Sequence, residues 1–123
     1  MKSHPIIKTL IILLIYFLYG CAPEIDRSDP KVVVKEYLEA TVSGNCDLAM
    51  RYVHEPSYAK RKACEDGQIA SLRIDELLYD EELSRFIVDV VGDVTFKNED
   101  GSFKSGDFFG VPVKRVQGEW YVR

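Results

Sequence analysis

The sequence of 123 residues predicts an α+β domain, with N-terminal helices packed in a curved antiparallel sheet. Two observations predict this fold class. Between residues 29 and 65, capping residues flank stretches whose apolar side chains recur every three or four positions, as in amphipathic helices. From residue 70 onwards apolar and polar side chains alternate instead, as in strands with one buried face. Helices followed by a meander of strands are the order typical of an α+β domain.

The first predicted helix has both of its ends marked in the sequence. Asp29 supplies a side-chain cap and Pro30 suits the first helical position, where a missing backbone N–H costs nothing. Gly44 ends the helix, because glycine tolerates the left-handed conformation that follows many helices. The stripe expected to face the core consists of Val34, Tyr37, Leu38, Thr41 and Val42.

Two shorter helices are predicted next. Asn45 can cap a helix over residues 46–53, which has Ala49 and Tyr52 on its inward face. Ser57 can cap a third helix that runs to about residue 65, where an Asp-Gly pair ends it. The third helix is polar and offers the core little apolar surface.

The clearest strand covers residues 86–96. Its predicted inward face consists of Phe86, Val88, Val90, Gly92, Val94 and Phe96. Residues 98–101 supply a hairpin turn. The next strand carries apolar residues at 109, 111 and 113, and Pro112 indicates an edge position or a bulge. A further turn leads to a last strand over residues 120–122.

Residues 70–79 fit two structures. Leu72, Ile74 and Leu78 alternate with polar neighbours, which indicates a strand. Ile74, Leu77 and Leu78 also fit a helix. We favour the strand, and on that interpretation Glu76 lies on the apolar face, beside Leu72 and Ile74.

The first 21 residues resemble the leader of a bacterial lipoprotein. Lys2 and Lys8 precede an apolar run over residues 9–20, and the last four residues, Leu18-Tyr19-Gly20-Cys21, resemble a lipobox. The resemblance implies a signal peptide over residues 1–20, cleavage before Cys21, and acyl chains such as palmitate on that cysteine. A run of 12 residues is short for a membrane span, which needs about 20. A signal anchor and an ordinary secretory signal remain as alternatives.

Cleavage before Cys21 would leave 14 basic and 20 acidic residues, a formal charge of −6. This charge argues against nucleic-acid binding, which requires a basic surface. It also argues against electrostatic binding to anionic headgroups, so the lipid is expected to hold the protein on the membrane. In the lipoprotein family Ala22, rather than aspartate, after the cysteine implies the outer membrane, facing the periplasm. We expect a lipidated tether over residues 21–28 and one domain over residues 29–123.

The other two cysteines, Cys46 and Cys64, form an even pair in a compartment that permits disulfides. His54 is the one histidine after the leader, and two thiols with one imidazole do not complete a four-ligand zinc site. A structural disulfide between the two cysteines is therefore favoured over a metal or redox site. We expect no cofactor.

Residues 29–123 resemble a known family. The capped Asp29-Pro30 helix, the Gly44-Asn45-Cys46-Asp47-Leu48-Ala49 stretch and the C-terminal Gly118-x-Trp120-Tyr121-Val122 strand carry the resemblance. They look like small exported lipoproteins of the DUF4878 type, in the nuclear-transport-factor-2-like (NTF2-like) superfamily. The resemblance implies a cone in which a curved sheet wraps a long helix. Members include isomerase-type and cyclase-type enzymes as well as binding proteins, so the fold leaves the function open.

We expect a non-catalytic binding or interaction module in the cell envelope. An apolar pocket for a small ligand or a partner's side chain would be lined by Tyr37, Glu76, Phe86, Val88, Val90 and Trp120. One alternative is an inhibitor or immunity-type protein that acts on another envelope protein. Another is a cone-type enzyme with Glu76 as its base, since a buried carboxylate has a raised pKa. His54 is the other acid/base candidate.

Overall fold

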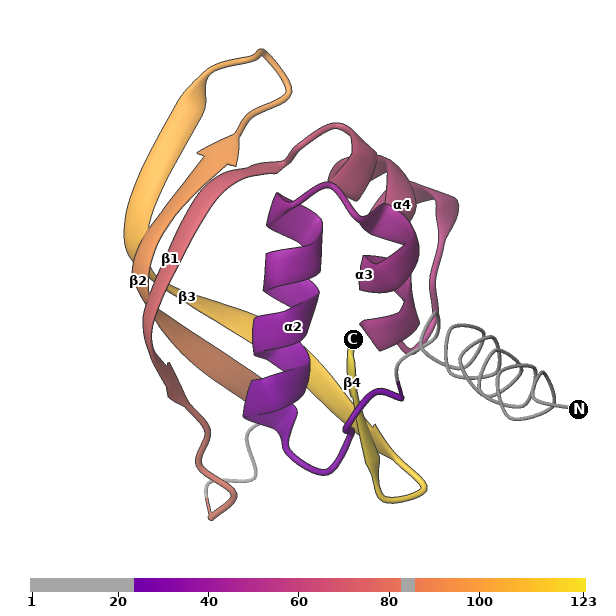
Figure 1. Ribbon diagram of the computed structural model, residues 1–123. Coiled ribbons are helices and arrows are strands. Elements are labelled where there is room, and N and C mark those ends of the chain that lie inside the picture. Colours follow the sequence, from indigo (N-terminus) through magenta and orange to yellow (C-terminus); the bar gives the residue numbers. More distant parts are fainter. Residues whose placement is uncertain (1–23, 83–85) are drawn as a thin grey trace, which may run out of the picture.

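The computed structural model describes residues 24–82 and 86–123, and within them the chain forms helices followed by a meander of strands (Figure 1). The helices are α2 (Pro30–Val42), α3 (Cys46–Tyr52) and α4 (Tyr58–Glu65). The strands are β1 (Ile69–Leu78), β2 (Ile87–Lys97), β3 (Phe103–Val116) and β4 (Glu119–Val122). All neighbouring strands are antiparallel, in the order β1-β2-β3-β4. The predicted α+β class is therefore confirmed.

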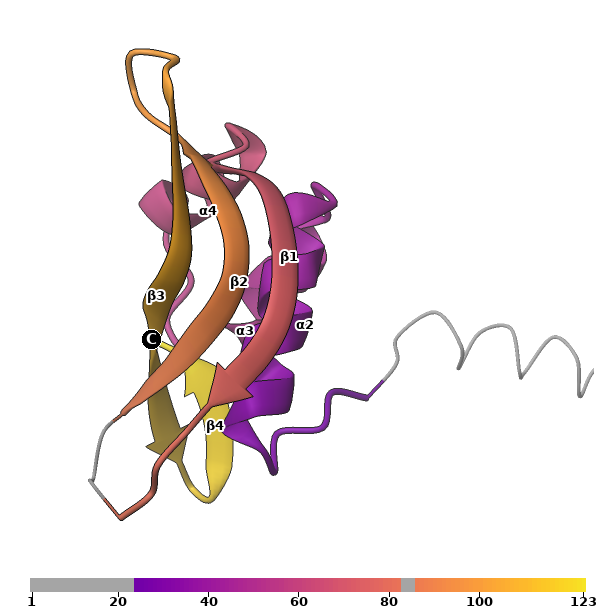
Figure 2. The same cartoon turned by 90° about the vertical axis from the view of Figure 1, so that its left-hand side faces the viewer.

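The sheet bows around the helices, which all lie on its concave side (Figure 1), and Figure 2 looks at the sheet from the other side. The concave side is called the inner face here, and the opposite side the outer face. None of the helices in the described ranges is both long and apolar enough to cross a bilayer. The expected signal peptide, Cys21 and its lipid lie outside the described residues.

Helix α2 begins and ends as its caps predict. The Asp29 side chain accepts a hydrogen bond from the Lys31 backbone N–H at 2.9 Å, and Pro30 is the first helical residue. Gly44 has a φ of +78°, the left-handed conformation that a side chain would disfavour. The buried face of α2 consists of Pro30, Val33, Val34, Leu38, Ala40 and Thr41.

Helices α3 and α4 are joined by the predicted disulfide, which is confirmed. Cys46, at the start of α3, bonds to Cys64, near the end of α4, with 5.8 Å between their Cα atoms. Cys64 is also the one buried residue of α4. Because α4 places so little apolar surface in the core, the disulfide is its principal attachment to the domain.

The segment that fitted either a helix or a strand is strand β1, and it contains a bulge. Ile74 pairs with Gly92, but the next paired residues are Glu76 and Val91, so Asp75 is an extra residue in β1. After this extra residue, each side chain of β1 points to the face opposite to the one that simple alternation predicts. Leu77 therefore packs towards the core, whereas Glu76 is exposed, contrary to the expectation that it would lie on the apolar face.

Gly92 permits the close approach of β1 to β2 at this bulge. A Cβ atom at position 92 would lie 1.9 Å from the backbone oxygen of Arg73. On β2 the predicted inward residues Val88, Val90 and Val94 are buried, at most 2% exposed.

Strand β3 is long enough to pair with two strands in succession. Residues 103–112 pair with β2, and residues 113–116 pair with β4. Pro112 lies where β3 changes partner, which suits a residue without a backbone N–H. Phe86 precedes β2 and is 54% exposed, so it is not part of the buried core.

Candidate functional site

The inner face of the sheet is filled by side chains of α2. Val88 and Val90 on β2 are at most 1% exposed, as are Val33, Val34 and Leu38 on the helix, and all belong to one core cluster. Trp120 on β4 is 3% exposed and belongs to the same cluster. Three of the residues expected to line a pocket, Val88, Val90 and Trp120, are therefore core residues at these positions.

Tyr37 and Glu76 do not meet inside the domain. Tyr37 is partly buried against the core, and this burial raises the pKa of its phenol. Glu76 instead borders a surface depression of about 350 Å³ between α2 and β1, together with Lys35 and Glu39. Glu76 is exposed to solvent rather than buried beside Tyr37. The geometry thus does not favour Glu76 as the base of a cone-type enzyme.

Phe86 and Trp120 do come together, at one end of the sheet. They border a depression of about 570 Å³ with Tyr79, Arg115, Glu81 and Gly118. The rings of Tyr79 and Trp120 meet edge to face, with centroids 5.3 Å apart, and the Arg115 guanidinium lies 5.6 Å from the Trp120 ring centroid. An aromatic wall with one nearby cation suits a small apolar group that carries a negative charge.

A second candidate surface lies on the outer face of the sheet. We call it the outer apolar patch, and its residues are Leu78, Ile87, Val91, Phe108 and Pro112. Cross-strand pairs, which share a face, connect them: Ile87 pairs with Pro112, and Val91 with Phe108. Phe108 is 59% exposed, and Leu78 and Ile87 are each 43% exposed. Apolar side chains gathered in this way on a solvated face are typical of a protein contact.

Acidic residues accompany the outer apolar patch. Asp89 pairs with Leu78 on one side and Gly110 on the other, and Glu76 pairs with Val91. Gly110 leaves space for the Ile87 side chain, because a Cβ atom at position 110 would lie only 2.8 Å from Cγ2 of Ile87. The patch therefore combines an apolar centre with two carboxylates.

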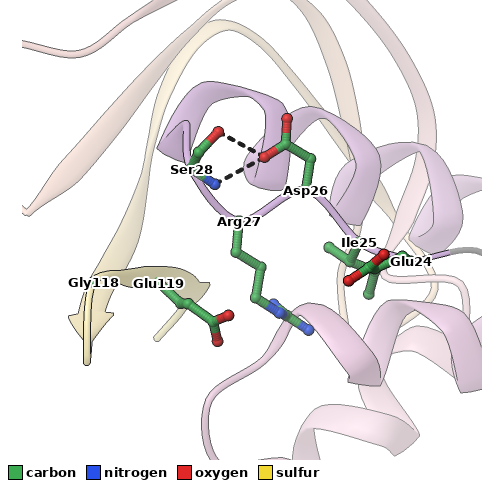
Figure 3. Close-up of a pocket in the computed structure, with 7 residues that line it drawn as sticks. All are labelled: Glu24, Ile25, Asp26, Arg27, Ser28, Gly118 and Glu119. Atoms are coloured by element: carbon green, nitrogen blue, oxygen red, sulfur yellow. Dashed lines mark hydrogen bonds between the residues drawn. The ribbon is translucent and has the colours of Figure 1, made fainter.

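Residues 24–28, which belong to the expected tether, pass beside β4 (Figure 3). We call this segment the anchor strap. Arg27 connects it to β4: the Arg27 backbone oxygen accepts a hydrogen bond from the Trp120 N–H at 2.9 Å. The Arg27 guanidinium donates to the backbone oxygens of Trp120 and Arg51 and lies 4.2 Å from the Tyr121 ring centroid. Nothing in the local sequence pattern predicts these contacts, because their partners are far away along the chain.

His54, the other acid/base candidate, also packs against β4. Its backbone N–H donates to the Val122 oxygen at 2.9 Å, and its ring lies edge to face with Tyr121 at 5.5 Å. Its Nδ1 atom is 3.8 Å from the Glu55 carboxylate. These contacts give His54 a structural position at the edge of the sheet.

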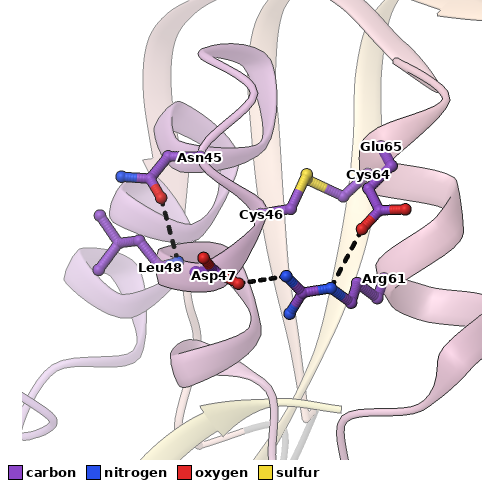
Figure 4. A network of polar contacts seen from close by, with 7 residues as sticks. All are labelled: Asn45, Cys46, Asp47, Leu48, Arg61, Cys64 and Glu65. Carbon is purple, nitrogen blue, oxygen red and sulfur yellow. Dashed lines mark hydrogen bonds and ion pairs between the residues drawn. A yellow bond between two sulfur atoms is a disulfide. The ribbon is translucent and has the colours of Figure 1, made fainter.

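The disulfide is surrounded by ion pairs (Figure 4). The Arg61 guanidinium binds the Asp47 carboxylate on α3 and, at 3.1 Å, the Glu65 carboxylate on its own helix. The hydrogen bond and charge of Asp47 raise the pKa of Arg61. This arrangement connects α3 to α4 and presents no nucleophile.

A buried tyrosine connects α2 to α3. The Tyr52 hydroxyl donates to the Glu36 carboxylate at 2.8 Å. Burial and this carboxylate together raise the pKa of Tyr52 to about 12, so its phenol keeps its proton. Within residues 24–82 and 86–123, histidines, cysteines and carboxylates form no cluster able to hold a metal ion. Comparison of the chain with protein-family models and with curated proteins found no match.

Proposed function

We propose that this protein is a lipid-anchored envelope lipoprotein whose single NTF2-like domain binds another protein without catalysing a reaction. The observation that carries the proposal is the contrast between the two faces of the sheet. Its inner face is filled by α2, with Val88 and Leu38 at most 1% exposed, whereas its outer face exposes apolar side chains to solvent. Because the interior is filled, the outer apolar patch is the apolar surface that we assign to a partner.

The chemistry of the patch specifies the kind of partner. Phe108, Ile87 and Leu78 supply an apolar centre, and Glu76 and Asp89 lie beside them. Complementarity requires a partner surface with apolar side chains at its centre and basic side chains around them. An exported protein of the same envelope with such a surface fits the lipoprotein leader, and an inhibitor or immunity-type role would use the same contact.

Photo-crosslinking in living cells tests the proposal. Phe108 and, as a matched control, Tyr58 are each replaced by a photoreactive phenylalanine. Tyr58 is an 82% exposed aromatic residue on α4, on the other side of the domain. We expect one adduct from position 108 and none from position 58, and mass spectrometry then identifies the adduct. Adducts from both positions, or from neither, would contradict the proposal.

Binding of the purified, identified partner completes this test. The substitutions Phe108→Ser and Asp89→Lys should each weaken binding, because the first removes apolar contact area and the second places a positive charge opposite a basic rim. Tyr58→Ser should leave the affinity unchanged. Equal affinity for all of these variants would locate the contact elsewhere.

A small ligand is the second candidate function, favoured by the aromatic depression at Trp120. Trp120 is the one tryptophan of the chain, so its fluorescence reports this site alone. Titration with the apolar anion anilinonaphthalene sulfonate should change this fluorescence, and the variant Phe86→Ala should weaken the effect. An identical titration curve for this variant would argue against ligand binding at the depression.

A further inference from the structure

We propose that the anchor strap holds the domain directly on the lipid surface, helix side towards the membrane and outer apolar patch away from it. This inference rests on the proposed lipid anchor at Cys21. It goes further, because a lipid anchor alone fixes where the domain is held and leaves its orientation free.

The strap is attached firmly to the domain through Arg27. Its backbone oxygen accepts from the Trp120 N–H at 2.9 Å, and its guanidinium donates to the Trp120 oxygen at 3.4 Å and to the Arg51 oxygen. The same guanidinium lies over the Tyr121 ring, at 4.2 Å from the centroid. A cation on an aromatic face and a hydrogen bond made by a charged group are both stronger than contacts between neutral groups.

The residues on either side of Arg27 also hold the strap in a fixed position on the domain. Ile25 is partly buried against the core. The Asp26 carboxylate accepts hydrogen bonds from the Ser28 N–H at 3.0 Å and from the Ser28 hydroxyl at 2.6 Å, which forms a tight turn (Figure 3). Asp29 then caps α2. The chain is thus fixed to the domain from residue 25 onwards.

Two residues, Ala22 and Pro23, are left between Cys21 and the start of the strap. The distance from Cys21 to Glu24 is then at most about 10 Å for an extended chain. A free tether to residue 28 would reach about 25 Å. Because a domain of 100 residues has a radius of gyration of about 13 Å, the short link prevents the domain from turning over on its anchor.

The place where the strap begins selects the face that meets the lipid. In Figure 1 the described chain starts on the helix side of the sheet, and in Figure 2 it starts to the right of α2. In Figure 1 the outer face of the sheet points the opposite way, and in Figure 2 this face is turned towards the viewer. The outer apolar patch is thereby presented to soluble or membrane-bound partners rather than to the bilayer that holds the anchor.

Fluorescence quenching on vesicles tests this orientation. With Cys21 lipidated and the other two cysteines in the disulfide, an added cysteine is the one reactive thiol. A fluorophore is attached at Glu55→Cys, beside His54 near the strap, or at Phe108→Cys, on the outer face. The protein is reconstituted into phosphatidylcholine vesicles whose headgroups carry a quencher. We expect strong quenching at position 55 and weak quenching at position 108.

A flexible insertion distinguishes an orientation set by the short link from a lipid anchor that leaves the domain free to rotate. A Gly/Ser segment of about 12 residues, with a root-mean-square span of about 20 Å, is inserted between Pro23 and Glu24. It should abolish the difference between the two positions. The same segment inserted between Asp100 and Gly101, in the β2–β3 turn, should leave the difference intact.

The two proposals fail in distinguishable ways. Intact mass without acyl chains would overturn the proposed lipid anchor and this inference with it. Acyl chains together with equal quenching at both positions would overturn the orientation alone. A difference that persists after the Pro23–Glu24 insertion would show that the domain surface, and not the short link, sets the orientation.

Discussion

Replacing Gly92 by alanine should destabilise the domain strongly, although it adds a single methyl group. The new Cβ atom would lie 1.9 Å from the Arg73 oxygen, 2.9 Å from the Arg73 carbonyl carbon and 3.1 Å from the Asp75 nitrogen. All three are backbone atoms of β1, so no side chain can rotate away and the two strands must separate. Overpacking of this kind costs about 1–3 kcal/mol, and the rigid obstacle here argues for the upper end.

Thermal unfolding measures this cost. At about 3 kcal/mol, and about 4–8 °C per kcal/mol for a domain of this size, the melting temperature should fall by roughly 10–25 °C. Gly106→Ala is the matched control, because a Cβ atom there has nothing within 4 Å. Removing glycine's extra freedom in the unfolded chain should leave that variant as stable as the parent or slightly more stable. Similar melting temperatures for the two variants would refute the close approach of β1 to β2 at the bulge.

Three further predictions concern the disulfide, Glu76 and Tyr52. Reducing the Cys46–Cys64 disulfide should lower the free energy of unfolding by about 3 kcal/mol, measured in urea with and without reductant, and an unchanged midpoint would contradict this. Glu76→Gln should complement a deletion strain fully, since the carboxylate is exposed; a folded, exported but inactive variant would restore the enzyme hypothesis. Tyr52, with a pKa raised to about 12, stabilises the fold below pH 10, and that stability should be lost between pH 10 and 12. Tyr52→Phe should lose this part of the pH dependence in alkaline unfolding, and an identical alkaline profile would refute it.

The helix boundaries could be predicted because each depends on a few adjacent residues. Asp29, Asn45 and Ser57 each accept a hydrogen bond from a backbone N–H two or three residues later, as N-caps do. The disulfide could be predicted as well, from the even number of remaining cysteines and the expected oxidising compartment. In each case the information lies in the local sequence or in the composition.

The position of Glu76 could not be predicted in this way. Simple alternation along β1 places Glu76 beside Ile74, but the extra residue Asp75 exchanges the faces. The bulge depends on Gly92 in the next strand, which lets the two backbones approach. The anchor strap was missed for a similar reason, since Arg27 and Trp120 are 93 residues apart in the sequence.

The contacts along β4 also bear on how the protein avoids aggregation. An open strand edge offers unpaired backbone groups to any extended chain, and β4 would be such an edge beyond β3. Instead the Trp120 N–H is taken by Arg27 and the Val122 oxygen by His54. A chain shortened to begin at Asp29 would keep α2–α4 and β1–β4 but lose the hydrogen bond from the Trp120 N–H to Arg27. The strap is therefore part of the folded unit, and self-association through β4 is the expected cost of its removal.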